Sequence, residues 1–150
     1  MPKTIAVEII SPERQVSKTS AEAVVVPAWD GEMGILPGHE PYLAQLRAGE
    51  VRLRNGGGAD LFAVAGGFVE VSPERVRLFV ETAELAEEID LEKARQAAEK
   101  AKAEMSRKDI DPAALAGAEG AMRWAMAQVK VARRHRHSHG RPAGINGGTK

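Results

Sequence analysis

The feature that most constrains the fold of this chain is a change in hydrophobic period near residue 83. Before this point apolar and polar residues alternate, which is the pattern of half-buried β-strands. After it apolar residues recur at intervals of three and four, which is the pattern of amphipathic helices. The sequence therefore predicts a β-rich N-terminal part followed by helices.

Several short segments before residue 83 are predicted as strands. Residues 3–10 and 75–81 alternate most regularly, and residues 21–27 hold three consecutive valines that suit a strand covered on both faces. Residues 43–54 and 61–71 supply further strands. The four residues from Asn55 to Gly58 suit a hairpin turn, and Gly66-Gly67 indicates a bulge or a close backbone approach. Short strands at near-regular spacing predict a β-sandwich or flattened barrel.

Two helices are predicted after the strands, with Asp90 and Asp111 as N-caps and Pro112 in the first helical position. Alanine dominates the apolar stripe of each helix, so the two helices can pack closely but bury little apolar area. We therefore expect a weakly held helical hairpin. The stripes are Leu91, Ala94, Ala98, Ala101 and Met105 in the first helix, and Leu115, Ala118, Met122, Ala125, Val129 and Ala132 in the second.

The zero net charge of the chain conceals an asymmetry. All 21 acidic residues lie at or before Glu119, whereas seven basic residues follow it. The first 119 residues thus hold 14 basic against 21 acidic residues, a net charge of −7. Halves of opposite sign could attract each other or face different partners. From residue 135 on, glycine, proline and polar residues dominate, which predicts a disordered tail.

The composition excludes several classes of function. The absence of cysteine excludes thiolate catalysis, disulfides and cysteine-bound zinc, and 4% aromatic residues are too few for a stacking platform. No apolar run reaches the roughly 18 residues of a membrane helix, and the N-terminus does not read as a signal peptide. His39 is the only histidine before residue 135, in a segment (34–41) interpreted as a turn-rich loop without a nearby nucleophile.

The C-terminal region has two sequence features that could bind a ligand, and each has a simpler interpretation. Alternating His135, His137 and His139 could bind a metal as an extended strand, but no carboxylate lies near them in sequence to complete a ligand set. The basic run over residues 130–136 could bind nucleic acid, but it lacks interleaved aromatic residues. A flexible tail and a solvated helix end account for both, so we expect no metal and no nucleic acid.

Three segments together resemble a known family. They are residues 31–39 (GEMGILPGH), residues 66–71 (GGFVEV) and the junction from Glu81 to Asp90. In this order, and followed by two alanine-rich helices, they resemble the epsilon subunit of bacterial F-type ATP synthases over residues 3–134. The resemblance implies a ten-stranded β-sandwich followed by an antiparallel two-helix hairpin. The expected parts are the sandwich over residues 1–86, the hairpin over 87–134, and a disordered basic, His-rich tail over 135–150.

The resemblance also implies a function. The chain would be a non-catalytic rotor subunit of the central stalk of the proton-translocating synthase, coupling c-ring rotation to ATP synthesis. It would lie peripherally on the cytoplasmic face of the bacterial cell membrane, with the gamma subunit, the c-ring and the beta and alpha subunits as partners. Glu32 matches the position that approaches the c-ring, and His39 matches a position near gamma. Tight-turn formation is an ordinary role for the same loop.

In that family the hairpin regulates hydrolysis. It folds on the sandwich in one state and extends into the catalytic head in another, where basic residues meet an acidic segment of the beta subunit and inhibit ATP hydrolysis. The basic face expected to do this here, without compensating carboxylates, comprises Arg123, Lys130, Arg133 and Arg134. Weak docking of the hairpin is consistent with such a switch.

Some family members bind regulatory ATP through an Ile-Asp-x-x-Arg-Ala motif. The matching residues here are Ile89, Asp90, Lys93 and Ala94, with lysine in place of the arginine and its planar fork. ATP is therefore only a weak candidate ligand, and no other cofactor is expected. The alternative function is a stand-alone β-sandwich ligand-binding module with a helical tail, which the low aromatic content argues against.

Overall fold

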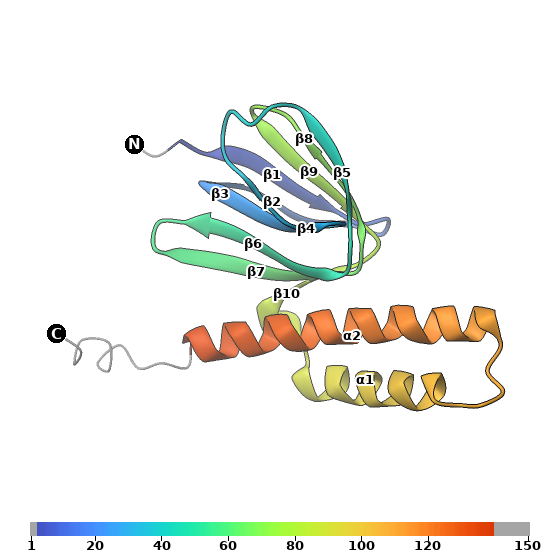
Figure 1. The fold of residues 1–150 in the computed structure, drawn as a ribbon. Coiled ribbons are helices and arrows are strands. Elements are labelled where there is room, and N and C mark those ends of the chain that lie inside the picture. The colour runs from blue at the N-terminus through green and yellow to red at the C-terminus, as the bar shows by residue number, and fades with distance from the viewer. Residues whose placement is uncertain (1–2, 140–150) are drawn as a thin grey trace.

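The computed structural model describes residues 3–139 of the 150-residue chain, with side chains up to residue 136. Within these residues, ten strands are followed by a 3-10 turn and two helices (Figure 1). The strands are β1 (Ile5–Ile10), β2 (Gln15–Ala21), β3 (Ala23–Ala28), β4 (Gly31–Ile35), β5 (Tyr42–Leu46), β6 (Gly49–Asn55), β7 (Gly58–Val64), β8 (Gly67–Val71), β9 (Arg75–Val80) and β10 (Ala83–Leu85). The turn η1 covers Ala86–Glu88, and the helices are α1 (Leu91–Met105) and α2 (Pro112–His139).

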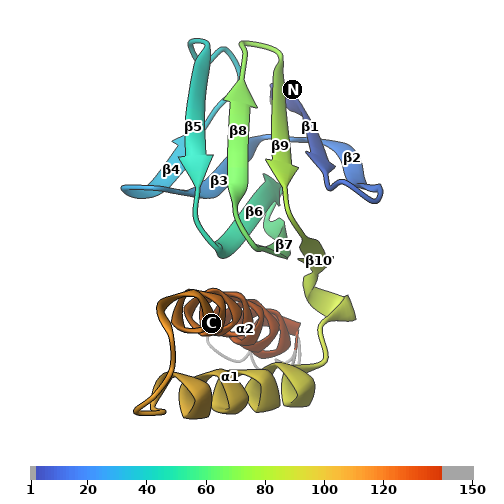
Figure 2. The same ribbon diagram turned by 90° about the vertical axis from the view of Figure 1, so that its right-hand side faces the viewer.

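The ten strands form one hydrogen-bonded sheet that folds over itself. Its order is β10-β7-β6-β3-β5-β8-β9-β1-β2, with β4 paired to β3 outside this path. Strands β1 and β9 are parallel. Because β3 and β5 share only the pair Ala28 and Leu46, the sheet turns at this point and its two halves face each other (Figure 2). The predicted β-sandwich followed by a helical hairpin is confirmed.

Period-2 alternation selects the side chains of the sandwich core. On β1, Ile5, Val7 and Ile9 are buried while the residues between them are more exposed. The valine run on β3 departs slightly from expectation, because Val24 and Val26 are fully buried but Val25 only partly. The largest fully buried side chains on the other strands are Ile35, Val51, Leu53, Phe62, Val64, Val69 and Leu78.

Two glycine predictions are confirmed. The β6–β7 hairpin closes at the pair Asn55 and Gly58, and Gly56 adopts a φ of +57° in the turn. Gly67 adopts a φ of +142°, and a Cβ added there would lie 2.0 Å from the Phe79 carbonyl oxygen. Only glycine therefore allows β8 to approach β9 this closely.

Three strands lack a pattern that predicts them, and one loop prediction is wrong. The sequence predicts a turn-rich loop over residues 34–41, but Gly34 and Ile35 belong to β4, which pairs with β3. Two glycines in five residues hide the alternation of β4. β2 is mostly polar and exposed, and β10 has only three residues, so neither shows a clear period. Strand structure thus continues past the change of period near residue 83.

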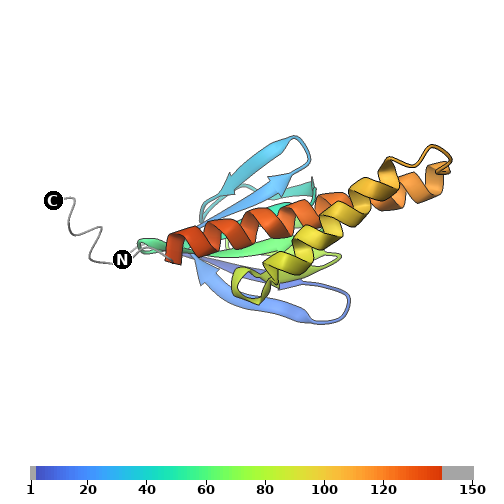
Figure 3. The same cartoon turned by 90° about the horizontal axis from the view of Figure 1, so that it is seen from below.

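The helical hairpin has the predicted caps and the predicted seam. The backbone N–H of Lys93 donates to the Asp90 carboxylate (3.1 Å), and that of Ala114 donates to the Asp111 carboxylate (2.8 Å). α2 lies between α1 and the sandwich (Figures 1 and 3). The buried residues of the seam are small: Ala94 and Ala101 on α1, and Ala118, Ala125, Val129 and Ala132 on α2.

α2 has a second buried face that the sequence analysis did not identify. Val131 is fully buried in a cluster with Ala63 of β7 and Ala86 of η1. Leu61, Ile89 and Trp124 pack around this cluster. The face was missed because it holds few apolar residues and is interrupted by the polar Gln128, whose amide donates to Glu84. The hairpin therefore docks on the sandwich through a small apolar cluster and polar contacts.

The prediction of a disordered tail from residue 135 is wrong for residues 135–139. α2 continues to His139, because the helical backbone does not stop where the apolar periodicity fades. This also removes the extended strand on which His135, His137 and His139 were considered as metal ligands. The remainder of the predicted tail, residues 140–150, lies outside the described residues.

Candidate functional site

The candidate site is the surface where β4 and β6 approach α2. Outward-facing residues of β6 alternate with its core residues, so Glu50 and Arg52 point away from the sandwich interior while Val51 and Leu53 point into it. In register, Glu50 pairs with Ala63, which packs against Val131 of α2. The charged side chains of Glu50 and Arg52 therefore lie on the face of the sheet on which α2 docks.

Glu32, the predicted c-ring contact, lies on β4 with its side chain 52% exposed. Both carboxylate oxygens accept from Arg52: Oε2 from Nη1 at 3.1 Å and Oε1 from Nη2 at 3.3 Å. The hydrogen bond from Arg52 is the main cause that lowers the pKa of Glu32 below its usual range. The positive charges of Arg52, Lys130 and Arg134 lower it further. The Glu32 and Glu50 carboxylates raise the pKa of Arg52, with Glu32 the larger effect.

Glu50 is a residue of the candidate site that the sequence did not predict. It is 2% exposed, and its Oε1 accepts a hydrogen bond from Arg52 Nη1 (2.8 Å) and forms an ion pair with Arg134, whose Nη1 lies 3.2 Å away. Four side chains from two strands and one helix are thereby linked in the order Glu32–Arg52–Glu50–Arg134, which we call the charge network. The signal that could have found Glu50 is a carboxylate within the apolar alternation of a strand, two residues from an arginine.

The structure brings only some residues of the predicted basic face together, and the prediction that this face lacks compensating carboxylates is wrong. Arg123, Lys130 and Arg134 fall on one side of α2, and Arg123 and Lys130 line a hollow of about 470 Å³ together with Glu32 and Glu50. Arg133 is exposed and does not line this hollow. The face was expected to lack compensating carboxylates, but Arg134 is paired with Glu50. The burial of a strand carboxylate could not be foreseen from the helix sequence.

His39, the predicted gamma contact, follows β4 after a turn and is partly exposed. Its backbone N–H donates to the Leu36 carbonyl (3.1 Å), and its Nδ1 lies 2.8 Å from the Glu40 carbonyl oxygen. The preceding Gly38 donates to the Pro73 carbonyl (2.9 Å) and has a φ of +87°. The turn therefore has defined hydrogen bonds, and none of them joins His39 to the charge network.

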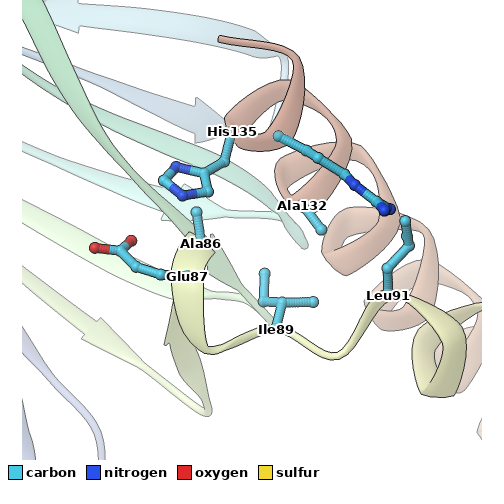
Figure 4. Close-up of a pocket in the computed structure, with 7 residues that line it drawn as sticks. Ala86, Glu87, Ile89, Leu91, Ala132 and His135 are labelled. Carbon is cyan, nitrogen blue, oxygen red and sulfur yellow. The ribbon is translucent and has the colours of Figure 1, made fainter. Parts of the chain in front are cut away.

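The four candidate ATP-binding residues are not gathered at one cavity. Ile89 lines a hollow of about 540 Å³ between the β10–α1 junction and the C-terminal half of α2, together with Glu87, His135 and Arg136 (Figure 4). Asp90, Lys93 and Ala94 do not line it. The Asp90 carboxylate caps α1 and Ala94 is buried in the seam. The ordinary structural roles of this motif are thus the ones that its contacts support.

Strands β5, β8 and β9 lie side by side in one layer of the sandwich (Figure 2), and apolar side chains of this layer are exposed. Leu43 is 65% exposed and Phe68 is 46% exposed, and Phe68 stacks on Phe79 with ring centroids 5.1 Å apart. An apolar hollow lined by Ile10, Pro12 and these two phenylalanines continues the surface. Exposed aromatic and aliphatic groups of this kind are typical of protein–protein interfaces.

The part of the chain that the structure describes has neither a metal-binding cluster nor a membrane-spanning helix. Residues 3–136 hold no group of three or more histidine, aspartate or glutamate side chains placed to bind a metal ion. Neither of the helices that the structure describes is long and apolar enough to span a membrane.

Known proteins share both parts of this architecture. Residues 4–86 match the family described as ATP synthase, Delta/Epsilon chain, beta-sandwich domain. The chain is 39% identical over 132 residues to an ATP synthase epsilon chain of Dehalococcoides mccartyi, covering 88% of this chain and 94% of that one. It is 40% identical over 131 residues to the epsilon chain of Halalkalibacterium halodurans, covering 87% and 98%.

Solved structures are similar as well. A chain in the cryo-EM structure of Euglena gracilis mitochondrial ATP synthase, comprising OSCP, F1 and c-ring, superimposes with a TM-score of 0.75 at 28% identity, covering 88% of this chain and 82% of that one. A chain of the Tetrahymena thermophila mitochondrial ATP synthase central stalk and c-ring shares the fold with a TM-score of 0.55 at 13% identity. With the sandwich matched by the family pattern and the hairpin included in the aligned relatives, the chain belongs to the ATP synthase epsilon-chain family.

Proposed function

We propose that this chain is a non-catalytic central-stalk subunit of a proton-translocating F-type ATP synthase, which couples c-ring rotation to ATP synthesis and inhibits ATP hydrolysis through its hairpin. The observation that carries the rotor role is the likeness of both parts of the chain to a subunit within an F1 and c-ring assembly. Its partners are the gamma subunit, the c-ring, and the beta and alpha subunits. The chain lies peripherally at the cytoplasmic face of the bacterial cell membrane.

The sandwich is the part that binds the rotor. The exposed Glu32 on β4 suits a contact with the polar loops of the c-ring, and the turn with His39 suits a contact with gamma. The apolar surface of Leu43, Phe68 and Phe79 supports binding of a large protein partner, because such a surface is costly to leave in water. Rigid β-strands hold these contacts, as torque transmission requires.

The hairpin is the part that regulates hydrolysis. α2 docks through the cluster around Val131, while a hollow remains beside the middle of the helix, so the contact with the sandwich is limited. When the hairpin extends, Arg123, Lys130, Arg133 and Arg134 are available to an acidic segment of the beta subunit. Regulatory ATP is not included in this proposal, because three of its four candidate residues lie away from the hollow that Ile89 lines.

A reversible crosslink tests the inhibitory role. The chain has no cysteine, so Ala63→Cys and Val131→Cys introduce the only thiols, at two positions of the same buried cluster. Oxidation should hold the hairpin docked and raise ATP hydrolysis by membrane-bound enzyme, and reduction should restore inhibition. Each single-cysteine variant is the matched control. A chain ending at residue 86 should support ATP synthesis and also lose inhibition; equal hydrolysis by the full and shortened chains would exclude an inhibitory hairpin.

A further inference from the structure

Glu50 is the one polar or charged residue that is buried among the described residues, and its burial depends on α2. It faces away from the sandwich core on β6, so in the absence of the helix this side chain would face solvent. A buried carboxylate is tolerated only when cations and donors compensate its lost hydration. The two cations that do so come from different parts of the molecule.

Arg52 is a permanent partner of Glu50, whereas Arg134 is a conditional one. Arg52 lies two residues along the same strand, so it remains beside Glu50 wherever the hairpin is. Arg134 belongs to α2, and it leaves with the helix. The second oxygen of Glu50, Oε2, is buried with no hydrogen-bond partner among the described residues. Glu50 therefore depends on Arg134 more than a fully satisfied carboxylate would.

Arg52 also divides its donors between two carboxylates. Its Nη1 donates to Glu50 and to Glu32, and its Nη2 donates to Glu32. Glu32 lies at the exposed end of the charge network, and Arg134 lies at the helical end. A change at Glu32 thus alters how much of the Arg52 charge is available to Glu50.

We propose that Glu50 is the positioning residue that holds α2 on the sandwich, and that a cationic partner group bound to Glu32 weakens this hold through Arg52. A cation on Glu32 releases Arg52 to donate fully to Glu50, which then needs Arg134 less. It also cancels the attraction of Glu32 for the cations of α2. Both effects favour release of the helix, and this part of the inference rests on the proposed mobility of the hairpin.

Glu32 of β4 and Lys130 of α2 line the same hollow, and their charges interact across it. After the larger effect of Arg52, the charges of Lys130 and Arg134 also lower the pKa of the Glu32 carboxyl. Coupling between two sites is reciprocal, so a helix that stabilises ionised Glu32 is itself held by that charge. Arg134 cannot serve Glu50 and an acidic segment of the beta subunit at once, so Glu50 competes with the inhibitory contact.

The test measures docking in the full isolated chain. Fluorophores on Ala59→Cys and Ala116→Cys, both exposed positions, report the separation of β7 from α2. Glu50→Gln and Arg134→Gln should each raise the ratio of undocked to docked chain on the order of three- to tenfold. The double variant should be no worse than the stronger single one. Arg133→Gln, which removes the same charge one residue away, should change nothing.

Arg134→Gln alters only an exposed helical position, so its result stands even if Glu50→Gln affects the sheet. Two further variants, at Glu32 and Glu74, test the link to β4. Glu32→Gln should raise the undocked ratio by roughly twofold, whereas Glu74→Gln, on the β8–β9 turn, should not. An unchanged or lower undocked ratio in Glu50→Gln and Arg134→Gln overturns the positioning role, and an unchanged ratio in Glu32→Gln overturns the link to β4.

Hydrolysis in the assembled enzyme separates this inference from the proposed function. If Glu50→Gln undocks the hairpin in the isolated chain and also lowers ATP hydrolysis, both proposals hold. If it undocks the hairpin without changing hydrolysis, Glu50 positions α2 but the hairpin does not inhibit. If docking is unchanged while the residue-86 truncation raises hydrolysis, the inhibitory function stands and the role of Glu50 is rejected.

Discussion

The sandwich and the hairpin are held together by different amounts and kinds of contact. The sandwich buries branched and aromatic side chains from both of its layers, including Phe62, Ile9 and Leu78. The hairpin seam is largely alanine, and α2 meets the sheet through one small apolar cluster and a few polar pairs. Because apolar stabilisation scales with buried area, the sandwich is the rigid part and the hairpin is the releasable part.

Phe62→Ala should give the largest effect, because it removes a fully enclosed ring from the sandwich core. We expect a loss of about 3–5 kcal/mol in the free energy of unfolding. Urea denaturation followed by circular dichroism measures the loss. A loss below about 1 kcal/mol would show that the sandwich is not the more tightly packed region.

Val131→Ala should have a smaller and more local effect. Val131 is buried in the cluster between α2 and the sheet, where its two lost methyl groups weaken docking by about 1–2 kcal/mol. Hydrogen exchange should speed up in α1 and α2 while β1, β8 and β9 keep their protection. Equal acceleration in both regions would mean that sandwich and hairpin unfold as one unit. Exposed Ala116→Gly serves as a control for helix propensity alone.

Gly117→Ala should act in the opposite direction. Gly117 lies within α2, and an added Cβ would meet no atom within 4 Å. Alanine should stabilise the helix by about 0.5–1 kcal/mol, because it lowers the entropy of the unfolded chain without strain. Exchange from the N-terminal half of α2 should slow accordingly. The contrasting variant is Gly67→Ala, which should destabilise the sandwich because of the positive φ and the Phe79 carbonyl.

The pH dependence contributed by Glu32 should be the smallest effect, because the side chain is half exposed and solvent screens its pairing. The folded-state pKa is below the ordinary value of 4.5, so the pairing stabilises the fold above pH 4.5 and is lost as pH falls through the folded-state pKa. NMR titration of Glu32 should show its pKa rising toward 4.5 in Arg52→Gln, and rising less in Lys130→Gln. A lower pKa in either variant would contradict the assigned cause.

Much of the fold follows from patterns that are local in sequence. The alternation of Ile5, Val7 and Ile9 predicted a strand and its inward face, and Asp90 and Asp111 predicted where the helices begin. β4 escaped prediction because its two glycines break the period, and its strand character comes from pairing with β3. The predicted end of α2 was too early for a related reason, since the helical hydrogen bonds continue beyond the last residue of the apolar helical period.

The candidate site divides in the same way. Glu32, His39 and the basic residues of α2 could be named in advance from a resemblance in local sequence. Glu50 could not, because its importance arises only when β6 pairs with β7 and α2 crosses the outer face of both (Figure 3). Its partner Arg134 lies 84 positions away in sequence, and no local pattern encodes that distance.

The sequence by itself determined that strands come first and two helices follow, the alternating core of the sandwich and the small side chains of the hairpin seam. Those features depend on the spacing of apolar residues, on the secondary-structure propensity of each residue and on helix capping, all of which act between near neighbours in sequence. Only the tertiary structure decided which β6 charge is buried and which helical cation compensates it. Burial of a charge depends on surfaces brought together from distant parts of the chain, so it is settled when α2 docks on the sheet.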